Sequence, residues 1–196
     1  MSDPLGRVKY INYLHGLQRA LQSDKPHQVA DARRTLAQLR HSFVEGRQYQ
    51  AYEIVFQHAP PLRQNEAEVW LLVGGLFALH PLIWKDSGGA HSFGASLGKL
   101  RKKLDSPAVD RRLTVLLAKD GHSLPHHVRQ AVRLLSAHDV PVHYRQLLDD
   151  LVVLLGEDHR GDVASRVRLR WAQEYYLPTT AASSDDADAT DLSETE

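Results

Sequence analysis

The sequence contains no cysteine, and this absence removes several kinds of chemistry from consideration. Disulfides, iron–sulfur clusters, thiolate zinc sites and cysteine nucleophiles are all excluded. Long apolar runs are also lacking, because the longest, at residues 69–84, is interrupted by a glycine pair and a His-Pro pair and is too short to span a bilayer of about 30 Å. The N-terminus has no apolar stretch of the signal-peptide kind. We therefore expect a soluble, cytoplasmic protein that does not contact a membrane.

A net charge is missing as well, since 24 Lys and Arg residues balance 24 Asp and Glu residues. The charges are unevenly distributed along the chain. Residues 178–196 hold six acids and no Lys or Arg, which leaves a net charge of +6 on residues 1–177. Residues 96–133 hold nine bases and three acids and are therefore +6 by themselves. A basic middle and an acidic tail indicate a polyanionic partner.

Strand signals are scarce, and apolar residues recur every three or four positions along most of the chain. We predict an all-α, compact, two-lobed bundle of about eight or nine helices over residues 1–177. The N-terminal lobe is expected at about 1–104 and the C-terminal lobe at about 105–177. Residues 178–196 are poor in apolar side chains, so we expect a disordered acidic tail. The expected helices are 10–21, 26–40, 49–56, 66–80, 93–104, 107–117, 123–135, about 143–155 and about 161–177.

Glycine, proline and capping residues refine this prediction. Asp24 and Ser106 each stand shortly before a proline, which is typical of a cap followed by a first-turn proline. Gly74 and Gly75 lie within the apolar segment 66–80, and we expect them to permit the close approach of a neighbouring backbone.

The segment GASLGK at 94–99 superficially suggests a phosphate-binding loop. Its glycine spacing is one residue too short for a Walker A motif, and no strand precedes it. We interpret it as a tight packing contact at the start of a helix.

Twelve histidines raise the question of a metal site. His138 and Asp139 resemble the dipeptide of the HD phosphohydrolases, but the upstream histidine spacing is far too short for that site. We expect His126 and His127 in the first turn of an exposed helix and His138 near its end, where a cation suits the helix dipole. No nucleophile elbow and no pair of carboxylates in an apolar run are present. The residues predict no catalytic group, no metal ligand and no cofactor.

The basic residues are more informative, because three successive predicted helices present them outward. Arg129 and Arg133 are four apart and are expected to project away from the core side of their helix, while Arg101 lies at the edge of a core stripe and is expected to be structural. Lys99, Lys102, Arg112 and Lys119 add further outward cations. Surfaces that are merely solvated mix charges of both signs, so this pattern favours a polyanion-binding face. Aromatic residues do not alternate with the cations in sequence, which indicates contact with phosphates rather than stacking on bases.

A set of short motifs resembles the CasB family, the small subunit of the type I-E CRISPR RNA-guided surveillance complex called Cascade. The resemblance covers about residues 69–177. The motifs are LFALHP at 76–81, FGASLG at 93–98, SPAVDRRL at 106–113, LPHHVRQAVRLL at 124–135, VPV at 140–142, QLL at 146–148 and RW at 170–171.

This resemblance implies a two-lobed, all-α, non-catalytic subunit that occurs as a pair within the complex. Its expected partners are the other Cascade subunits, a second copy of itself, the CRISPR RNA-guided complex, and the target and displaced DNA strands. Its basic surfaces are expected to hold DNA strands in the opened R-loop. The candidate nucleic-acid-binding residues are Arg33, Arg34, Lys99, Lys102, Arg111, Arg112, Lys119, Arg129 and Arg133.

Two other functions compete with this one. The chain could be a helical scaffold whose basic face docks an acidic protein partner, and salt-dependent DNA binding distinguishes that case from the first. A metal-dependent phosphohydrolase is a more distant alternative, which metal analysis of the purified protein tests.

Overall fold

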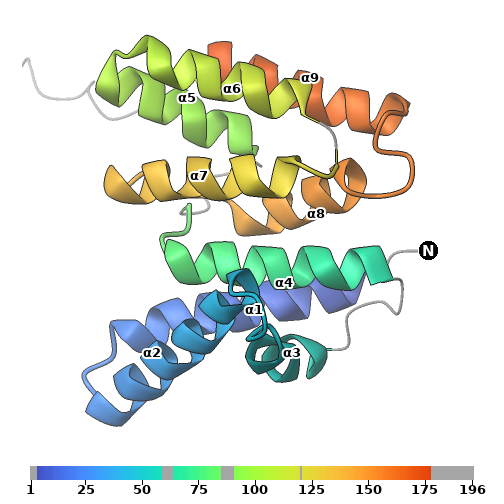
Figure 1. The fold of residues 1–196 in the computed structure, drawn as a ribbon. Helices are drawn as coiled ribbons and strands as arrows, with labels where there is room; N and C mark the ends of the chain where they lie inside the picture. The colour runs from blue at the N-terminus through green and yellow to red at the C-terminus, as the bar shows by residue number, and fades with distance from the viewer. Residues whose placement is uncertain (1–3, 59–63, 85–90, 120, 178–196) are drawn as a thin grey trace, which may run out of the picture.

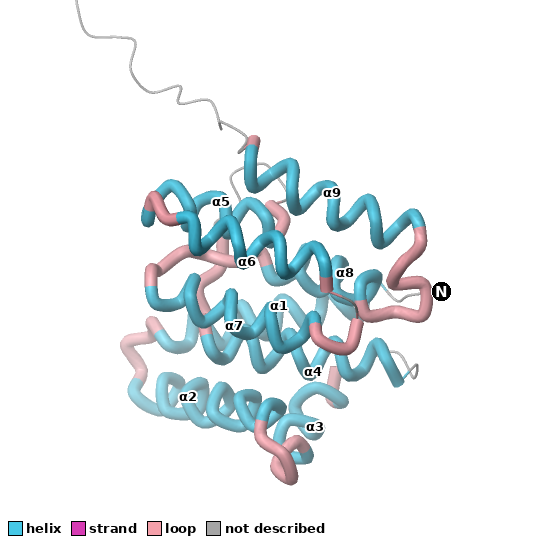
Figure 2. Tube along the Cα trace, turned by 45° about the horizontal axis from the view of Figure 1, so that its top comes forward, coloured by secondary structure: helices cyan, strands magenta, loops and turns pink. Residues whose placement is uncertain are grey.

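The fold of this chain is a stack of helices, seen in a computed structural model that describes residues 4–58, 64–84, 91–119 and 121–177 (Figures 1 and 2). No strand longer than a single bridge between Ile83 and Val142 occurs within these residues, which confirms the all-α prediction. The expectation of a disordered tail at 178–196 lies outside the described residues. The helices are α1 (Pro4–Leu21), α2 (Pro26–Arg40), the 3-10 helix η1 (His41–Phe43), α3 (Tyr49–Phe56), α4 (Gln64–Leu79), α5 (Phe93–Leu104), α6 (Pro107–Ala118), α7 (Leu124–Ala137), α8 (Tyr144–Leu154) and α9 (Asp162–Tyr176).

The helix ends follow the capping and proline signals, with one exception. Ser106 is the N-cap of α6 and its hydroxyl accepts a hydrogen bond from the backbone N–H of Ala108 at 3.3 Å, as expected. The N-cap of α2 is Lys25, without a side-chain cap, so the assignment of a cap at Asp24 is wrong. Pro26 alone provides the local signal there, because its fixed φ suits the first turn.

The helices group into two sets around α4, which runs through the middle of the molecule (Figure 1). Helices α2, α3 and η1 pack with α4, and α1 packs on α2 and reaches α4 through Tyr10, which stacks on Trp70. Helix α5 packs with α6, α7 and α9. Helix α5 buries its apolar stripe mainly against α9, and the expected division into lobes after residue 104 stays a prediction. The two sets meet where α4 contacts α7 and α8, and where α1 contacts α8.

Glycines permit the closest helix contact. A Cβ atom at Gly94 would collide with the backbone of Trp171, and one at Gly98 would lie 2.9 Å from the carbonyl oxygen of Tyr175. The GASLGK segment is therefore a packing contact between α5 and α9, as interpreted from its sequence.

The glycine pair in α4 also marks a close contact, but with side chains. A Cβ atom at Gly74 would collide with the hydroxyl of Tyr10, and one at Gly75 would lie 2.6 Å from the ring of Phe43. The expectation of a neighbouring backbone at this pair is wrong, because the partners are large side chains of α1 and η1. The described helices include none that is both long and apolar enough to cross a bilayer.

Polar groups join the two sets of helices. Arg7 of α1 donates hydrogen bonds to Glu66 of α4 at 2.6 Å and to Asp149 of α8 at 2.9 Å. The hydroxyl of Tyr144 donates to the carbonyl oxygen of His80 at 2.5 Å, which fixes the start of α8 to the end of α4. These contacts hold the later helices, which carry most of the candidate basic residues, in place on the earlier ones.

Candidate nucleic-acid interface

Two adjacent arginines of α6 stand at the edge of a surface groove. The core residues of α6, such as Val109 and Leu113, face inward, so Arg111 and Arg112 are exposed on its outer side. The groove has a volume of about 460 Å³ and is lined by both arginines together with residues of α7 that include His127. In the described part of the chain neither arginine forms an ion pair with a carboxylate. Both guanidinium groups are therefore available to a ligand.

Lys119, just after α6, brings a further cation towards this groove. Desolvation by burial lowers the pKa of His127, and the charges of Lys119 and His126 lower it further. His127 is thus neutral at pH 7 and can accept or donate a hydrogen bond without repelling the arginines. His126 and His127 lie in the first turn of α7, and His138 caps its C-terminus, as the sequence predicts.

The two arginines of α7 have different surroundings. Arg133 is exposed, as expected. Arg129 is half-buried, and its guanidinium carbon lies 4.2 Å from the ring centroid of Phe43 in η1. Arg129 is therefore less exposed than Arg133, because η1 folds over α4 and reaches α7. Burial lowers the pKa of Arg129, and so does the charge of Arg133, but an arginine remains protonated at any ordinary pH.

Helix α5 contributes exposed lysines and one structural arginine. Lys102 is exposed, and the Nζ atom of Lys99 lies 5.1 Å from the ring centroid of Trp84. Arg101 pairs with Asp110 of α6 at 3.1 Å and lies over the rings of Tyr175 and Tyr176, which confirms its structural role. Because Asp110 is paired with Arg101, its carboxylate does little to reduce the positive charge that Arg111 and Arg112 give to α6.

Arg33 and Arg34 of α2 lie apart from the other candidates. Helix α2 is on the opposite side of α4 from α7 (Figures 1 and 2). Both arginines are exposed, and Arg34 lies 3.3 Å from Asp31 in an ion pair of the helix surface. Among the candidates, Arg111 and Arg112 line one groove, Arg129 lies against η1, and Arg33 and Arg34 lie on the far side of α4 (Figure 1).

Sequence reasoning missed a buried carboxylate that organises the C-terminal helices. Asp150 accepts hydrogen bonds from Trp171 Nε1 at 2.6 Å and from Gln146 Nε2 at 2.9 Å, and it pairs with Arg170. Burial raises the pKa of Asp150, while these donors oppose that rise. The signal was present, because Asp150 shares the apolar face of its helix with Leu147 and Leu154, three and four positions away. Its role is structural, since its donors come from α8 and α9.

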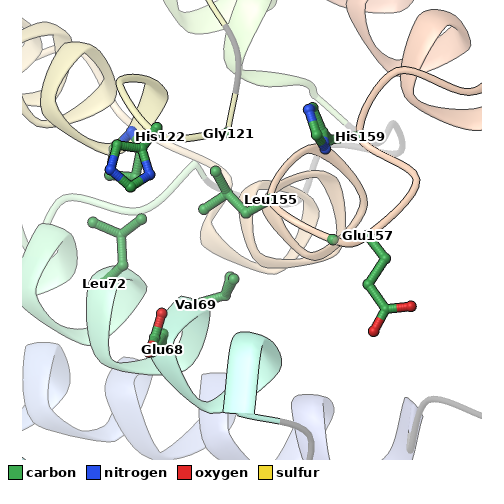
Figure 3. Close-up of a pocket in the computed structure, with 10 residues that line it drawn as sticks. Glu68, Val69, Leu72, Gly121, His122, Leu155, Glu157 and His159 are labelled. Carbon is green, nitrogen blue, oxygen red and sulfur yellow. The ribbon is translucent and has the colours of Figure 1, made fainter.

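A second cavity differs in character from the groove of α6 and α7. It has a volume of about 640 Å³, and Figure 3 shows Glu68, His122, Glu157 and His159 around an apolar floor that includes Leu155. Two carboxylates and no Lys or Arg line it, so it does not suit a phosphate chain. Across the described residues, no group of three or more His, Cys, Asp or Glu side chains is placed to hold a metal ion.

Comparisons with known proteins agree with this architecture. The family model for CRISPR-associated protein Cse2 matches residues 17–176 of the chain. A comparison with curated proteins found no match.

Solved structures provide the remaining similarities. A Cse2-family CRISPR-associated protein from Thermus thermophilus is 26% identical, with a TM-score of 0.60 over 90% of this chain and 99% of that one. CasB from M. ruber is 22% identical, with a TM-score of 0.58 over 82% of this chain and 90% of that one. A chain of a CRISPR RNA-guided surveillance complex is 17% identical, with a TM-score of 0.66 over 88% of this chain and 92% of that one. The last two show the likeness of the fold alone.

Proposed function

Since the chain belongs to the Cse2 family of CRISPR-associated proteins, we propose that it is a non-catalytic, cytoplasmic subunit of an RNA-guided surveillance complex of the type I-E Cascade kind. Its partners in this proposal are the other Cascade subunits with their guide RNA, a second copy of itself, and the target and displaced DNA strands. Its task is to bind the DNA backbone and thereby to stabilise the R-loop.

One observation carries the DNA-binding part of this proposal. Arg111 and Arg112 are exposed side by side at the groove of α6 and α7, and neither is paired with a carboxylate in the described part of the chain. Arginine forks suit phosphate oxygens. The exposed lysine Lys102 and the arginine Arg133 extend the cationic character to the neighbouring helices.

The energetics of R-loop formation suit such a surface. Exchanging a DNA duplex for an RNA–DNA hybrid is nearly balanced in free energy, so modest contacts that ignore sequence can decide the outcome. Contacts to phosphates have this property, because they carry no direct information about the bases. They also release counterions, which makes the binding free energy depend on salt.

The test is a double substitution, Arg111→Ala with Arg112→Ala, in the assembled complex. We expect weaker R-loop formation, and for the purified protein we expect the slope of log affinity for duplex DNA against log salt to fall by about two. The matched control is Arg19→Ala with Arg145→Ala, which removes the same charge from exposed positions of α1 and α8. Equal R-loop stability in the wild type and the Arg111/Arg112 variant would overturn the proposed DNA role.

The same variant distinguishes the competing scaffold function. If the basic face docks an acidic protein, the Arg111/Arg112 variant loses assembly into the complex while its own affinity for DNA stays unchanged. If the face binds DNA, the variant assembles normally and its R-loops dissociate sooner. The complex is therefore purified and its subunit composition measured before DNA is added.

A further inference from the structure

The contact between η1 and α7 links the two sets of helices. Phe43 is the last residue of η1, and its ring lies 4.2 Å from the guanidinium carbon of Arg129 in α7. Figure 1 shows η1 in front of α4 and below α7. Phe43 thus belongs to the N-terminal set of helices, whereas the arginine that it contacts belongs to the C-terminal set.

The position of Phe43 depends on the missing side chain of Gly75. A Cβ atom at this position of α4 would lie 2.6 Å from the ring of Phe43 and would collide with the hydroxyl of Ser42. Glycine therefore lets η1 settle onto α4, and this places the aromatic ring against α7. The glycine has a lower helix propensity than alanine, and the packing of η1 offsets this cost.

The contact leaves only part of the guanidinium of Arg129 free. Its Nε atom is buried and has no hydrogen-bond partner within the described residues, whereas neither terminal nitrogen is a buried atom without a partner. The described part of the chain also provides no carboxylate that pairs with Arg129. The aromatic ring holds the cation through its face and uses none of the terminal N–H groups. Those groups remain available next to exposed Arg133, one helical turn further along α7.

We propose that Phe43 is a positioning residue for DNA binding: its ring holds the guanidinium of Arg129 so that the terminal nitrogens meet a phosphate of the DNA backbone together with Arg133. This inference rests on the proposed function. A free arginine side chain loses rotamer entropy when it binds a phosphate, and a side chain that is already held loses less. Phe43 therefore raises DNA affinity without adding charge or touching DNA.

A double-mutant cycle on the full chain tests this role. The variants are Phe43→Leu, Arg129→Ala and the pair, and the probes are an oligo(dT) single strand and a mixed-sequence duplex at low salt. Phe43→Leu keeps an apolar side chain of similar reach and removes the ring face. We expect it to weaken binding about threefold to tenfold, the range of a cation–π contact that is partly desolvated.

The decisive measurement is the effect of Phe43→Leu on DNA affinity in a protein that already carries Arg129→Ala. If Phe43 acts by holding Arg129, the second substitution then has no further effect on DNA affinity. In the Arg133→Ala background, Phe43→Leu should still weaken DNA binding by its full factor. Phe43→Tyr keeps the ring face and should bind DNA as tightly as the wild type. Because the net charge is unchanged in Phe43→Leu, the salt slope stays that of the wild type, whereas Arg129→Ala lowers it by about one.

Two outcomes would overturn the inference. Equal losses from Phe43→Leu with and without Arg129 would show that the ring supports the fold rather than this side chain. Wild-type affinity in Phe43→Leu, with a loss in Arg129→Ala, would show that the guanidinium needs no support. Either result leaves the proposed function intact, since that function fails only if the arginine substitutions themselves have no effect on DNA.

Discussion

His80, at the end of α4, is a single residue whose burial links the stability of the fold to pH. The side chain is buried, and its Nε2 atom lies 2.7 Å from the carbonyl oxygen of Val140. A carbonyl only accepts hydrogen bonds, so Nε2 carries the proton and the neutral ring is satisfied. Burial lowers the pKa of His80, and the bond to Val140 and the charge of Asp139 only partly oppose this effect.

We expect acid to destabilise the fold through His80. Its pKa in the folded state lies below the ordinary value of 6.5, so the unfolded chain binds a proton first as pH falls. The contribution of His80 to the free energy of unfolding is therefore fully present above about pH 6.5. It is lost as the pH falls through the lower pKa of the folded state. Urea unfolding of the wild type and of His80→Gln between pH 7.5 and about 5 measures this, because glutamine keeps a donor for Val140 and does not titrate.

The pH profile of His80→Gln decides the prediction. It should be flatter than that of the wild type, though not flat, because burial lowers the pKa of His58 and His127 as well. Parallel profiles for the two proteins would contradict a role for His80 in the pH dependence.

At the scale of elements, the contact between α5 and α9 depends on two glycines one helical turn apart. Gly94 and Gly98 lie against the backbone of Trp171 and Tyr175, so the two helix backbones approach more closely than any side chain would permit. This contact also carries part of the candidate DNA surface, because Lys99 and Lys102 project from the same helix. Helix α5 is thereby held on α9 while its lysines face solvent.

Two glycine substitutions with opposite expected effects on the free energy of unfolding check this packing. Gly94→Ala should destabilise the protein by about 1–3 kcal/mol, since its Cβ atom would force α5 away from α9. Gly16→Ala should stabilise it by up to about 1 kcal/mol, because a Cβ atom there has no heavy atom within 4 Å and alanine favours the helix. Thermal and urea unfolding of both variants measure the two effects. A stable Gly94→Ala variant would mean that α5 and α9 can separate at little cost.

For the molecule as a whole, charge is divided between a basic body and an acidic terminal segment. The helical body, residues 1–177, carries a net charge of +6, and residues 178–196 carry six carboxylates. The described helices end beside a basic residue of α5, because the ring centroid of Tyr176 lies 5.7 Å from the guanidinium carbon of Arg101. A tethered anionic segment competes with DNA at an effective concentration that reaches the millimolar range for a flexible linker.

We therefore predict that a chain ending at Leu177 binds DNA more tightly than the full chain. The gain should be greatest at low salt, because charges more than about 10 Å apart are largely screened at ~0.1 M ionic strength. Titrating both proteins with the same duplex at low and high salt measures the difference. Equal affinities at low salt would mean that the terminal segment does not compete with DNA.

Much of this structure follows from local rules in the sequence. Helix periodicity and proline positions predicted the helices to within a few residues, since both act within one or two turns of chain, except that α1 begins at Pro4 rather than at Tyr10. The same periodicity predicted that Arg112 and Arg133 face solvent and that Arg101 is structural, because each position follows from the apolar stripe of its own helix. The family motifs predicted the membership that the comparisons confirm.

Other features depend on which elements meet in three dimensions. Local patterns do not reveal that η1 covers one face of Arg129, that Gly75 faces a ring, or that α5 groups with α9. Each depends on contacts between residues far apart in the sequence. The apolar stripe of a helix shows which of its faces is buried, but many other helices could cover that face equally well. The sequence alone determined the helices and the sign of their surfaces, whereas tertiary packing decided which helices meet and which cation lies against an aromatic ring, because only packing brings distant side chains within a few ångströms.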